Sequence, residues 1–128
     1  MMDWSRSLFR YTMPAFVWMA TIFVASSIPS QSFPDIGLFR QDKLLHLLIY
    51  FVLAILVHRA LVHQERFPFL ARNATLLTIL LCVVYGVSDE FHQWFVPGRT
   101  VSGYDVLADA AGACLAGVVV AMRRRMRP

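Results

Sequence analysis

The sequence has few of the residues that mark disulfide-rich, fibrous or soluble proteins. Its 128 residues include two cysteines, six glycines and six prolines, and charged residues make up 16% of the chain. Two cysteines are too few for a disulfide scaffold, and so little glycine and proline excludes a fibrous or low-complexity chain. Soluble domains carry about 25% charged residues. Hydrophobic residues instead make up 58% of this chain, which predicts an integral membrane protein.

Four apolar stretches are long enough to cross a bilayer, which takes about 20 residues. The stretches cover about residues 11–28, 44–62, 74–96 and 104–122. Pro14 stands near the start of the first stretch, where a helix loses little from the missing N–H. The connections are too short to form a second domain. The predicted fold is an all-α, four-helix transmembrane bundle that forms one domain over residues 1–128.

The scarce charges are divided unequally between two sets of segments. The N-terminus, residues 63–73 with the nearby Arg59, and the C-terminal tail hold nine basic and two acidic residues, a net charge of +7. The other connections and the adjoining helix ends hold three basic and six acidic residues, a net charge of −3. Because Lys and Arg are retained on the cytoplasmic side, both termini are predicted to be cytoplasmic. A cleaved signal peptide at the first stretch is the alternative, which the length of the stretch disfavours.

The net charge of +4 also raises the question of nucleic-acid binding. The arginines stand beside apolar stretches, with no aromatic interleaving and no recognised nucleic-acid motif. We therefore attribute the basic charge to topology and to contact with anionic lipids, and we expect no nucleic-acid partner.

Polar residues recur at helical spacing on the face predicted to lie outside the cytoplasm. The second stretch begins with Asp42, His46 and Tyr50, which are four residues apart, and with Lys43 beside them. The third ends with Gly86, Glu90 and Gln93 in one stripe, with Asp89 four residues before Gln93. The fourth begins with Asp105 and Asp109, after a turn that bears Arg99. Three helices are therefore predicted to direct polar stripes toward one depth.

Two interpretations of this cluster differ in what the charges do. A charged group in a span costs roughly 2.5–3.5 kcal/mol on insertion scales, so several together favour a functional pocket. In that interpretation His46, Glu90 and Asp105 are the candidate acid/base or orienting groups. The candidate ligand-binding residues are Asp42, Lys43, Tyr50, Gln93, Arg99 and Asp109. In the structural interpretation, Lys43 and Arg99 only neutralise carboxylates and hold the bundle together.

Metal chemistry and transport are less favoured by the sequence. Nitrogen and oxygen ligands are available from His46, Glu90, His92, Asp105 and Asp109. However, Glu90 and His92 diverge on a helix, and no HExxH or CxxC spacing is present. We therefore expect no metal and no cofactor. A proton- or cation-coupled transporter would need polar groups in the cytoplasmic half, where the sequence offers mainly leucine and isoleucine, such as Leu53, Ile55 and Leu77. A purely structural or partner-binding subunit is the third alternative.

The order of these elements resembles the VanZ-like family of small bacterial membrane proteins. The matching elements are Ser26-Ser27-Ile28-Pro29, Asp42-Lys43-Leu44-Leu45-His46 with Tyr50, Tyr85-Gly86 with Glu90 and Gln93, and Pro97-Gly98-Arg99 with Asp105 and Gly112. Together they cover about residues 23–117. One departure is Asp109, where the family more often has asparagine.

The resemblance implies a multi-pass protein of the bacterial cytoplasmic membrane. The founding member of the family is associated with low-level resistance to the glycopeptide teicoplanin. We therefore predict that the pocket binds or acts on a membrane lipid, a lipid-linked cell-wall intermediate or a glycopeptide. Neither the substrate, the presence of catalysis nor the oligomeric state follows from the sequence.

Overall fold

The protein is built from α-helices throughout the described residues. The structure, a computed structural model, describes residues 4–29 and 39–126, and the side chains of residues 4, 7, 8 and 39–42 lie outside this description. The helices are α1 (Trp4–Ser26), α2 (Phe39–His63), α3 (Pro68–Arg72), α4 (Ala74–Gln93) and α5 (Gly103–Arg125). The all-α prediction is confirmed. In lipid the backbone must satisfy its own hydrogen bonds, so long apolar runs become helices.

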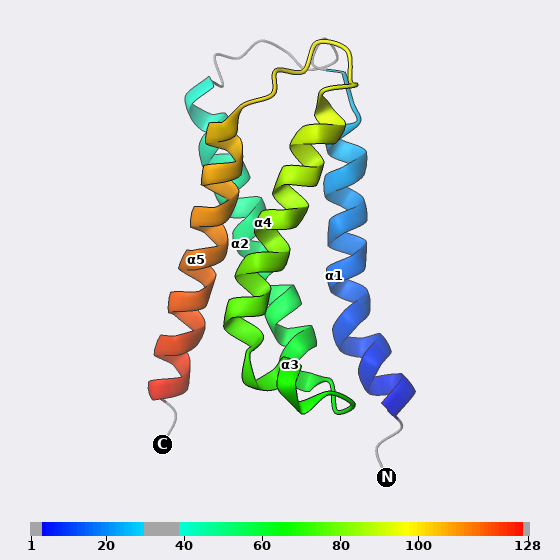
Figure 1. Cartoon of the computed structure of the whole chain (residues 1–128), viewed down its shortest axis with the longest axis vertical. Helices are drawn as coiled ribbons and strands as arrows, with labels where there is room; N and C mark the ends of the chain where they lie inside the picture. The colour runs from blue at the N-terminus through cyan, green and yellow to red at the C-terminus, as the bar shows by residue number, and fades with distance from the viewer. Residues whose placement is uncertain (1–3, 30–38, 127–128) are drawn as a thin grey trace.

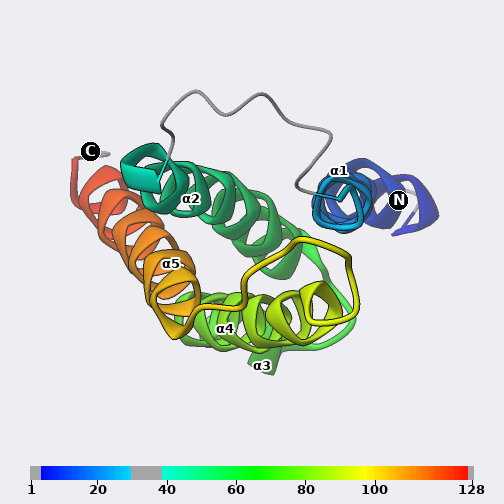
Figure 2. The same cartoon turned by 90° about the horizontal axis from the view of Figure 1, so that it is seen from above.

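The four long helices lie side by side along the length of the molecule (Figure 1). Seen from above, α2, α4 and α5 form one group, and α1 stands beside it (Figure 2). Trp18 links α1 to α2 through a hydrogen bond: its indole N–H donates to the carbonyl oxygen of Ile49 at 3.0 Å. Helix α1 begins and α5 ends at the end of the bundle where α3 also lies (Figure 1). The arginine-rich segments therefore share one end of the molecule.

Three helices, rather than the predicted four, meet the length and composition of a membrane span within the described residues. They are Lys43–His63, Ala74–Gln93 and Gly103–Arg125, with 21, 20 and 23 residues. Helix α1 is also 23 residues long, but it begins upstream of the predicted boundary. Its first turns therefore include Arg6 and Arg10, which lower its mean hydropathy.

Pro14 lies inside α1 and not near its start, because the helix begins at Trp4. A proline inside a helix removes one backbone hydrogen bond and crowds the preceding turn, which bends the helix. The first turns of α1 do bend away from the bundle (Figure 1). The sequence also did not predict α3, a short helix that has proline in its first turn.

Apolar and polar side chains are distributed as expected for a protein surrounded by lipid. Large apolar residues such as Phe16, Leu80, Val84 and Phe91 are exposed on the outside of the helices. The buried set combines apolar residues with charged ones, including four carboxylates. A water-soluble monomer rarely exposes so much apolar surface. The exposed apolar side chains support membrane embedding.

Helices α2 and α5 approach each other closely at Gly112. A Cβ atom there would overlap the carbonyl oxygen of Leu47 and lie 3.0 Å from the backbone nitrogen of Phe51. Only glycine allows the two backbones to come this near, as small residues do at helix contacts in membranes. The contact fixes the start of α2 against the start of α5, and these two segments carry most of the polar residues.

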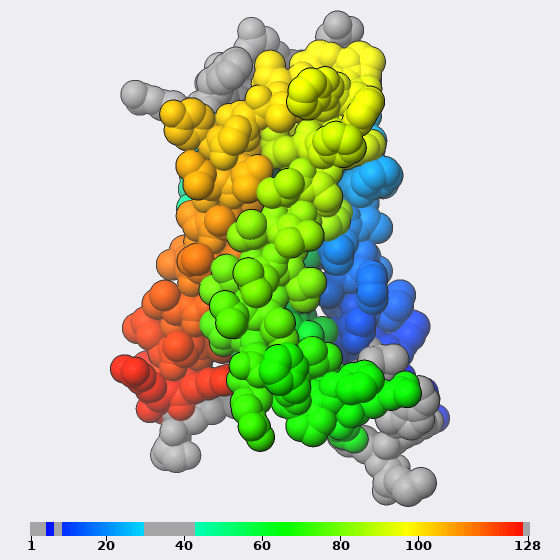
Figure 3. All heavy atoms as spheres, in the orientation of Figure 1, coloured from blue at the N-terminus to red at the C-terminus, as the bar shows by residue number. Residues whose placement is uncertain are grey.

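The connection between α4 and α5 covers the end of the bundle opposite the arginine-rich segments. In Figure 3 its yellow atoms extend across the top of the visible face. Ser102 closes this connection by accepting a hydrogen bond from the Tyr104 backbone N–H at 3.3 Å. Such a cap satisfies one of the free N–H groups at a helix start. It thereby fixes where α5 begins.

Candidate functional site

Three helices bring polar side chains together at the end of the bundle that the α4–α5 connection covers. His46 lies near the start of α2, Glu90 near the end of α4 and Asp105 in the first turn of α5. One nitrogen or oxygen atom of each residue lies within 4.8 Å of those of the other two. The three candidate acid/base residues therefore lie side by side. Together with the polar residues beside them they form a group that we call the polar cluster. It comprises Lys43, His46, Asp89, Glu90, Gln93, Asp105 and Asp109.

The deepest member of the polar cluster is Asp109, which is 1% exposed. Its Oδ1 lies 2.9 Å from Nδ1 of His46. An ionised carboxylate only accepts hydrogen bonds, so Nδ1 carries the proton and Nε2 keeps its lone pair in the neutral ring. A Cβ atom on Gly86 would lie 2.8 Å from Oδ2 of Asp109. The glycine therefore leaves the space that this carboxylate occupies.

The charge of Asp109 bears on its contact with His46. An asparagine at this position would be neutral, whereas the aspartate is an ionic partner of the imidazole when His46 is protonated. The second oxygen of Asp109 has no hydrogen-bond partner among the described residues. The carboxylate therefore has more capacity to accept hydrogen bonds than its one described contact uses.

Lys43 reaches across from α2 to α5 and forms an ion pair with Oδ1 of Asp105. The lysine side chain is 41% exposed and the aspartate side chain 5% exposed. The ammonium group is thus accessible at the rim of the polar cluster, while the carboxylate lies inside. The pair matches the structural interpretation, in which Lys43 neutralises a carboxylate, and the exposure of Lys43 also makes it reachable for a ligand.

Glu90 connects the end of α4 to the start of α5. Its Oε2 accepts a hydrogen bond from the backbone N–H of Ser102 at 3.0 Å. Its Oε1 is buried and has no partner among the described residues. A buried acceptor without a partner costs about 1–3 kcal/mol. Oε1 of Glu90 can therefore accept a hydrogen bond or bind a ligand, and leaving it without a partner in this buried position costs free energy.

The stripe on α4 continues with Asp89 and Gln93, both of which are buried. The amide nitrogen of Gln93 donates to Oδ2 of Asp89 at 3.1 Å, as their four-residue spacing predicts. Tyr50, on α2, is also buried, and its hydroxyl has no partner in the described part of the chain. Its ring centroid lies 6.2 Å from that of Tyr85. Tyr50 therefore belongs to the core beneath the polar cluster.

Arg99 contacts the end of α1. Its Nε donates to the carbonyl oxygen of Ile28 at 3.0 Å, and its terminal nitrogen to that of Ala25 at 2.8 Å. The last carbonyl groups of a helix lack partners within the helix, and a planar guanidinium can bind two of them. These contacts tie the α4–α5 connection to α1, a role that the sequence did not suggest.

Two further residues that the sequence offered as ligands, Asp42 and His92, are not part of the polar cluster as described. Asp42 lies in the first turns of α2, but its side chain is outside the described part of the chain. His92 points toward α1, where its ring is 2.9 Å from the Ser27 hydroxyl and stacks on Phe23. Glu90 and His92 therefore face different neighbours, as their two-residue spacing predicts.

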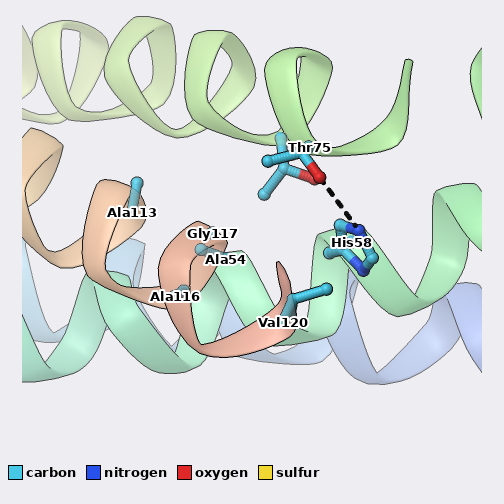
Figure 4. A pocket seen from close by; sticks show the side chains of 8 residues that line it. Ala54, His58, Thr75, Ala113, Ala116, Gly117 and Val120 are labelled. Atoms are coloured by element: carbon cyan, nitrogen blue, oxygen red, sulfur yellow. Dashed lines mark hydrogen bonds between the residues drawn. The ribbon is translucent and has the colours of Figure 1, made fainter. Parts of the chain in front are cut away.

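A second polar group lies nearer the arginine-rich end. His58 on α2 faces Thr75 on α4 at 3.4 Å, beside the small residues Ala113 and Gly117 of α5 (Figure 4). Thr78 is buried nearby, and its hydroxyl has no partner among the described residues. The contact between His58 and Thr75 was not predicted from the sequence, because leucine and isoleucine dominate this half. Extending the α4 stripe backward by fours from Gly86 through Cys82 would have found Thr78.

The comparisons with known proteins agree with this architecture. A family model described as VanZ/LLP1 matches residues 4–124, nearly the whole chain. The chain belongs to the VanZ/LLP1 family. The resemblance predicted from the sequence is thereby confirmed, and family membership together with the apolar helices supports a VanZ-like membrane protein.

One curated relative is Uncharacterized protein C11E3.10 of Schizosaccharomyces pombe. It is 38% identical over 77 residues, which cover 59% of this chain and 44% of the relative. The matched segment is thus less than half of that protein. Since the relative comes from a yeast, similar sequences are not confined to bacteria. No solved structure matches the chain.

Proposed function

We propose that the polar cluster binds the headgroup of a membrane lipid or of a lipid-linked envelope intermediate. The observation that supports this function is the burial of four carboxylates at one end of a bundle with an apolar outer surface. Each charged group in a span costs roughly 2.5–3.5 kcal/mol, so a cluster of this size is typical of a site.

The chemistry of the polar cluster suits a headgroup with a phosphate and hydrogen-bond donors. Lys43, at the exposed rim, is placed to bind a phosphate as a point charge. Glu90 and Asp109 each have a carboxylate oxygen with no described partner, and these accept hydrogen bonds from hydroxyl or ammonium groups. If the site is catalytic, His46 and Glu90 are the acid/base pair, because their side chains converge.

The binding function is tested by lipid retention. The full chain is purified in mild detergent, and lipids that copurify are measured by mass spectrometry. We expect Lys43→Gln and Glu90→Gln to lose a lipid that the wild type retains. Glu65→Gln is the matched control, because Glu65 is exposed at the other end of the bundle, between α2 and α3 (Figure 1). Equal retention by all four proteins refutes the proposal.

Turnover separates an enzyme from a binding module. The retained lipid is incubated with wild-type protein, and its products are followed over time. Products that disappear in His46→Gln identify an enzyme, whereas retention without products identifies a binding protein. A glycopeptide role is tested by whether expression raises teicoplanin tolerance in a susceptible bacterium and whether Glu90→Gln removes the effect.

We further propose that α1 is the fourth span and that both termini face the cytoplasm of a bacterial cell. Helix α1 has 23 residues, and its exposed surface includes Phe9, Phe16 and Val24. The net charge of +7 on the arginine-rich segments favours the cytoplasmic side. A green fluorescent protein fused to the C-terminus should therefore be fluorescent, and a periplasmic phosphatase fused there should be inactive. The reverse result contradicts the topology.

Transport is the second candidate function. It is favoured by His58, Thr75 and Thr78, which place polar groups between the helices in the half nearer the arginines. These residues supply polar side chains in the half where the sequence offers mainly leucine and isoleucine. Proton or cation flux into vesicles containing the purified chain, abolished in Glu90→Gln, would establish transport in place of headgroup binding.

A further inference from the structure

We propose that His46, Glu90 and Asp105 bind one divalent transition-metal cation. The three residues come from three different helices, and one candidate ligand atom of each lies within 4.8 Å of the others. Zn–N and Zn–O bonds are roughly 2.0–2.2 Å long, so two ligand atoms on one ion are roughly 3–4 Å apart. Small side-chain rotations therefore bring the three atoms onto one ion.

The imidazole of His46 is held in the orientation that metal-binding histidines adopt. Its Nδ1 is bonded to Oδ1 of the buried Asp109 at 2.9 Å. A ligating histidine commonly donates its other ring N–H to a carboxylate, which fixes the tautomer and makes the ligating nitrogen more basic. With Nδ1 bonded to Asp109, an ion bound by His46 would be ligated through Nε2.

Glu90 supplies an observation that does not depend on the spacing of the cluster. The residue is 5% exposed, and its Oε1 has no hydrogen-bond partner among the described residues. Its other oxygen is held by the Ser102 backbone N–H at 3.0 Å. A carboxylate fixed through one oxygen and unpartnered at the other, inside a group of candidate ligands, is arranged to bind a cation.

The charges of the polar cluster also favour a cation. Four carboxylates are buried in it. Lys43 forms an ion pair with Asp105. Asp109 contacts His46, whose ring is neutral when it ligates a metal, and the described partners of the other two carboxylates are a neutral amide and a backbone N–H. A buried carboxylate that lacks a counter-charge is strongly disfavoured. A divalent cation supplies positive charge to the carboxylates that the described contacts leave without a counter-charge.

The donor set of one imidazole and two carboxylates indicates which ions fit. Imidazole suits zinc and iron, whereas carboxylates also suit manganese and magnesium. A mixed nitrogen and oxygen set with three protein ligands is typical of a site that keeps coordination positions open. Zn²⁺ and Mn²⁺ are therefore the ions to test, and the open positions would accept water or a ligand oxygen.

The metal site is tested with the metal alone, so its outcome is independent of headgroup binding. The full chain, with any histidine tag removed, is stripped with a chelator in detergent and titrated with ZnCl₂ or MnCl₂ by calorimetry. We expect one equivalent of at least one of the two ions per chain. His46→Gln and Glu90→Gln should weaken binding at least about 10-fold, and Asp109→Asn about 10- to 100-fold through its effect on His46.

Two matched control variants, and one variant expected to bind the metal more tightly, distinguish a metal site from general damage to the fold. His63→Gln and Glu65→Gln change the same residue types at exposed positions, and they should bind the ion as the wild type does. Lys43→Gln removes a positive charge beside Asp105 and should tighten binding about 5-fold. Circular dichroism and elution volume identify variants that do not fold.

Three results would overturn the proposal. The first is a wild type that binds neither ion at one equivalent. The second is a folded Glu90→Gln that binds as tightly as the wild type. The third is a Lys43→Gln that binds less tightly than the wild type. If His46→Gln does not fold, the wild-type stoichiometry and the Lys43→Gln titration decide the question.

Discussion

The contact between α2 and α5 at Gly112 provides a quantitative test of the fold. In Gly112→Ala the new methyl group would overlap the carbonyl oxygen of Leu47. This neighbour is backbone, so no side-chain rotation relieves the overlap and the helices must separate by about 1 Å. Overpacking costs about 3 kcal/mol at its upper end, while replacing a helical glycine by alanine returns about 1 kcal/mol. We expect a net loss of about 2 kcal/mol.

Gly103→Ala is the matched control on the same helix. A Cβ atom there has no neighbour within 4 Å, so the substitution should be neutral or stabilise the protein by about 1 kcal/mol. The two variants should therefore differ by about 2–3 kcal/mol, which is roughly a 30- to 150-fold difference in the unfolding equilibrium constant. Unfolding of the detergent-solubilised chain is followed by circular dichroism during titration with a denaturing detergent.

The separation of α2 from α5 in Gly112→Ala should also disturb the polar cluster. His46 precedes Leu47, and Asp109 lies one turn before Gly112, so their 2.9 Å contact crosses the same interface. A separation of about 1 Å takes this contact beyond hydrogen-bond range. If Gly112→Ala unfolds at the same detergent concentration as Gly103→Ala, the close packing of α2 against α5 is wrong.

Two further predictions concern contacts around the polar cluster. Gly86→Ala places a methyl group 2.8 Å from Oδ2 of Asp109. The methyl group should displace the carboxylate and lower the free energy of unfolding by about 1–3 kcal/mol, measured in the same detergent titration. An unchanged free energy of unfolding would refute the contact between Gly86 and Asp109. Arg99→Gln loses both hydrogen bonds to the end of α1. It should destabilise the fold by about 1 kcal/mol and speed proteolysis of the connection between α4 and α5. Arg99→Lys should not restore resistance to the protease, because an ammonium group lacks the planar fork of a guanidinium.

Helical spacing was sufficient to predict which residues gather but not which ones pair. The four-residue repeats correctly placed His46, Glu90 and Asp105 at one depth, because residues three and four apart share a helix face. Pairing depends on the rotation of each helix about its axis, which the packing of Gly112 and Gly86 determines. The sequence therefore did not reveal that Asp109 contacts His46.

Backbone partners and helix starts were harder to predict. Arg99 binds carbonyl groups of α1, and backbone acceptors carry no residue-specific signal in a sequence. The start of α1 at Trp4 was missed because hydropathy marks the apolar segment of a helix and not its polar first turns. Metal-ligand motifs describe residues close in sequence, so their absence did not test the proposed ligands His46, Glu90 and Asp105, which are spread over three helices.

The distribution of the polar cluster over α2, α4 and α5 has a consequence for biosynthesis. Helix α5 is synthesised last, and it carries Asp105 and Asp109, the described ionic partners of Lys43 and His46. Until α5 enters the membrane, Lys43 and His46 on α2 lack these partners. A ribosome that stops before α5 therefore releases a chain whose polar cluster is incomplete and whose charges are not balanced.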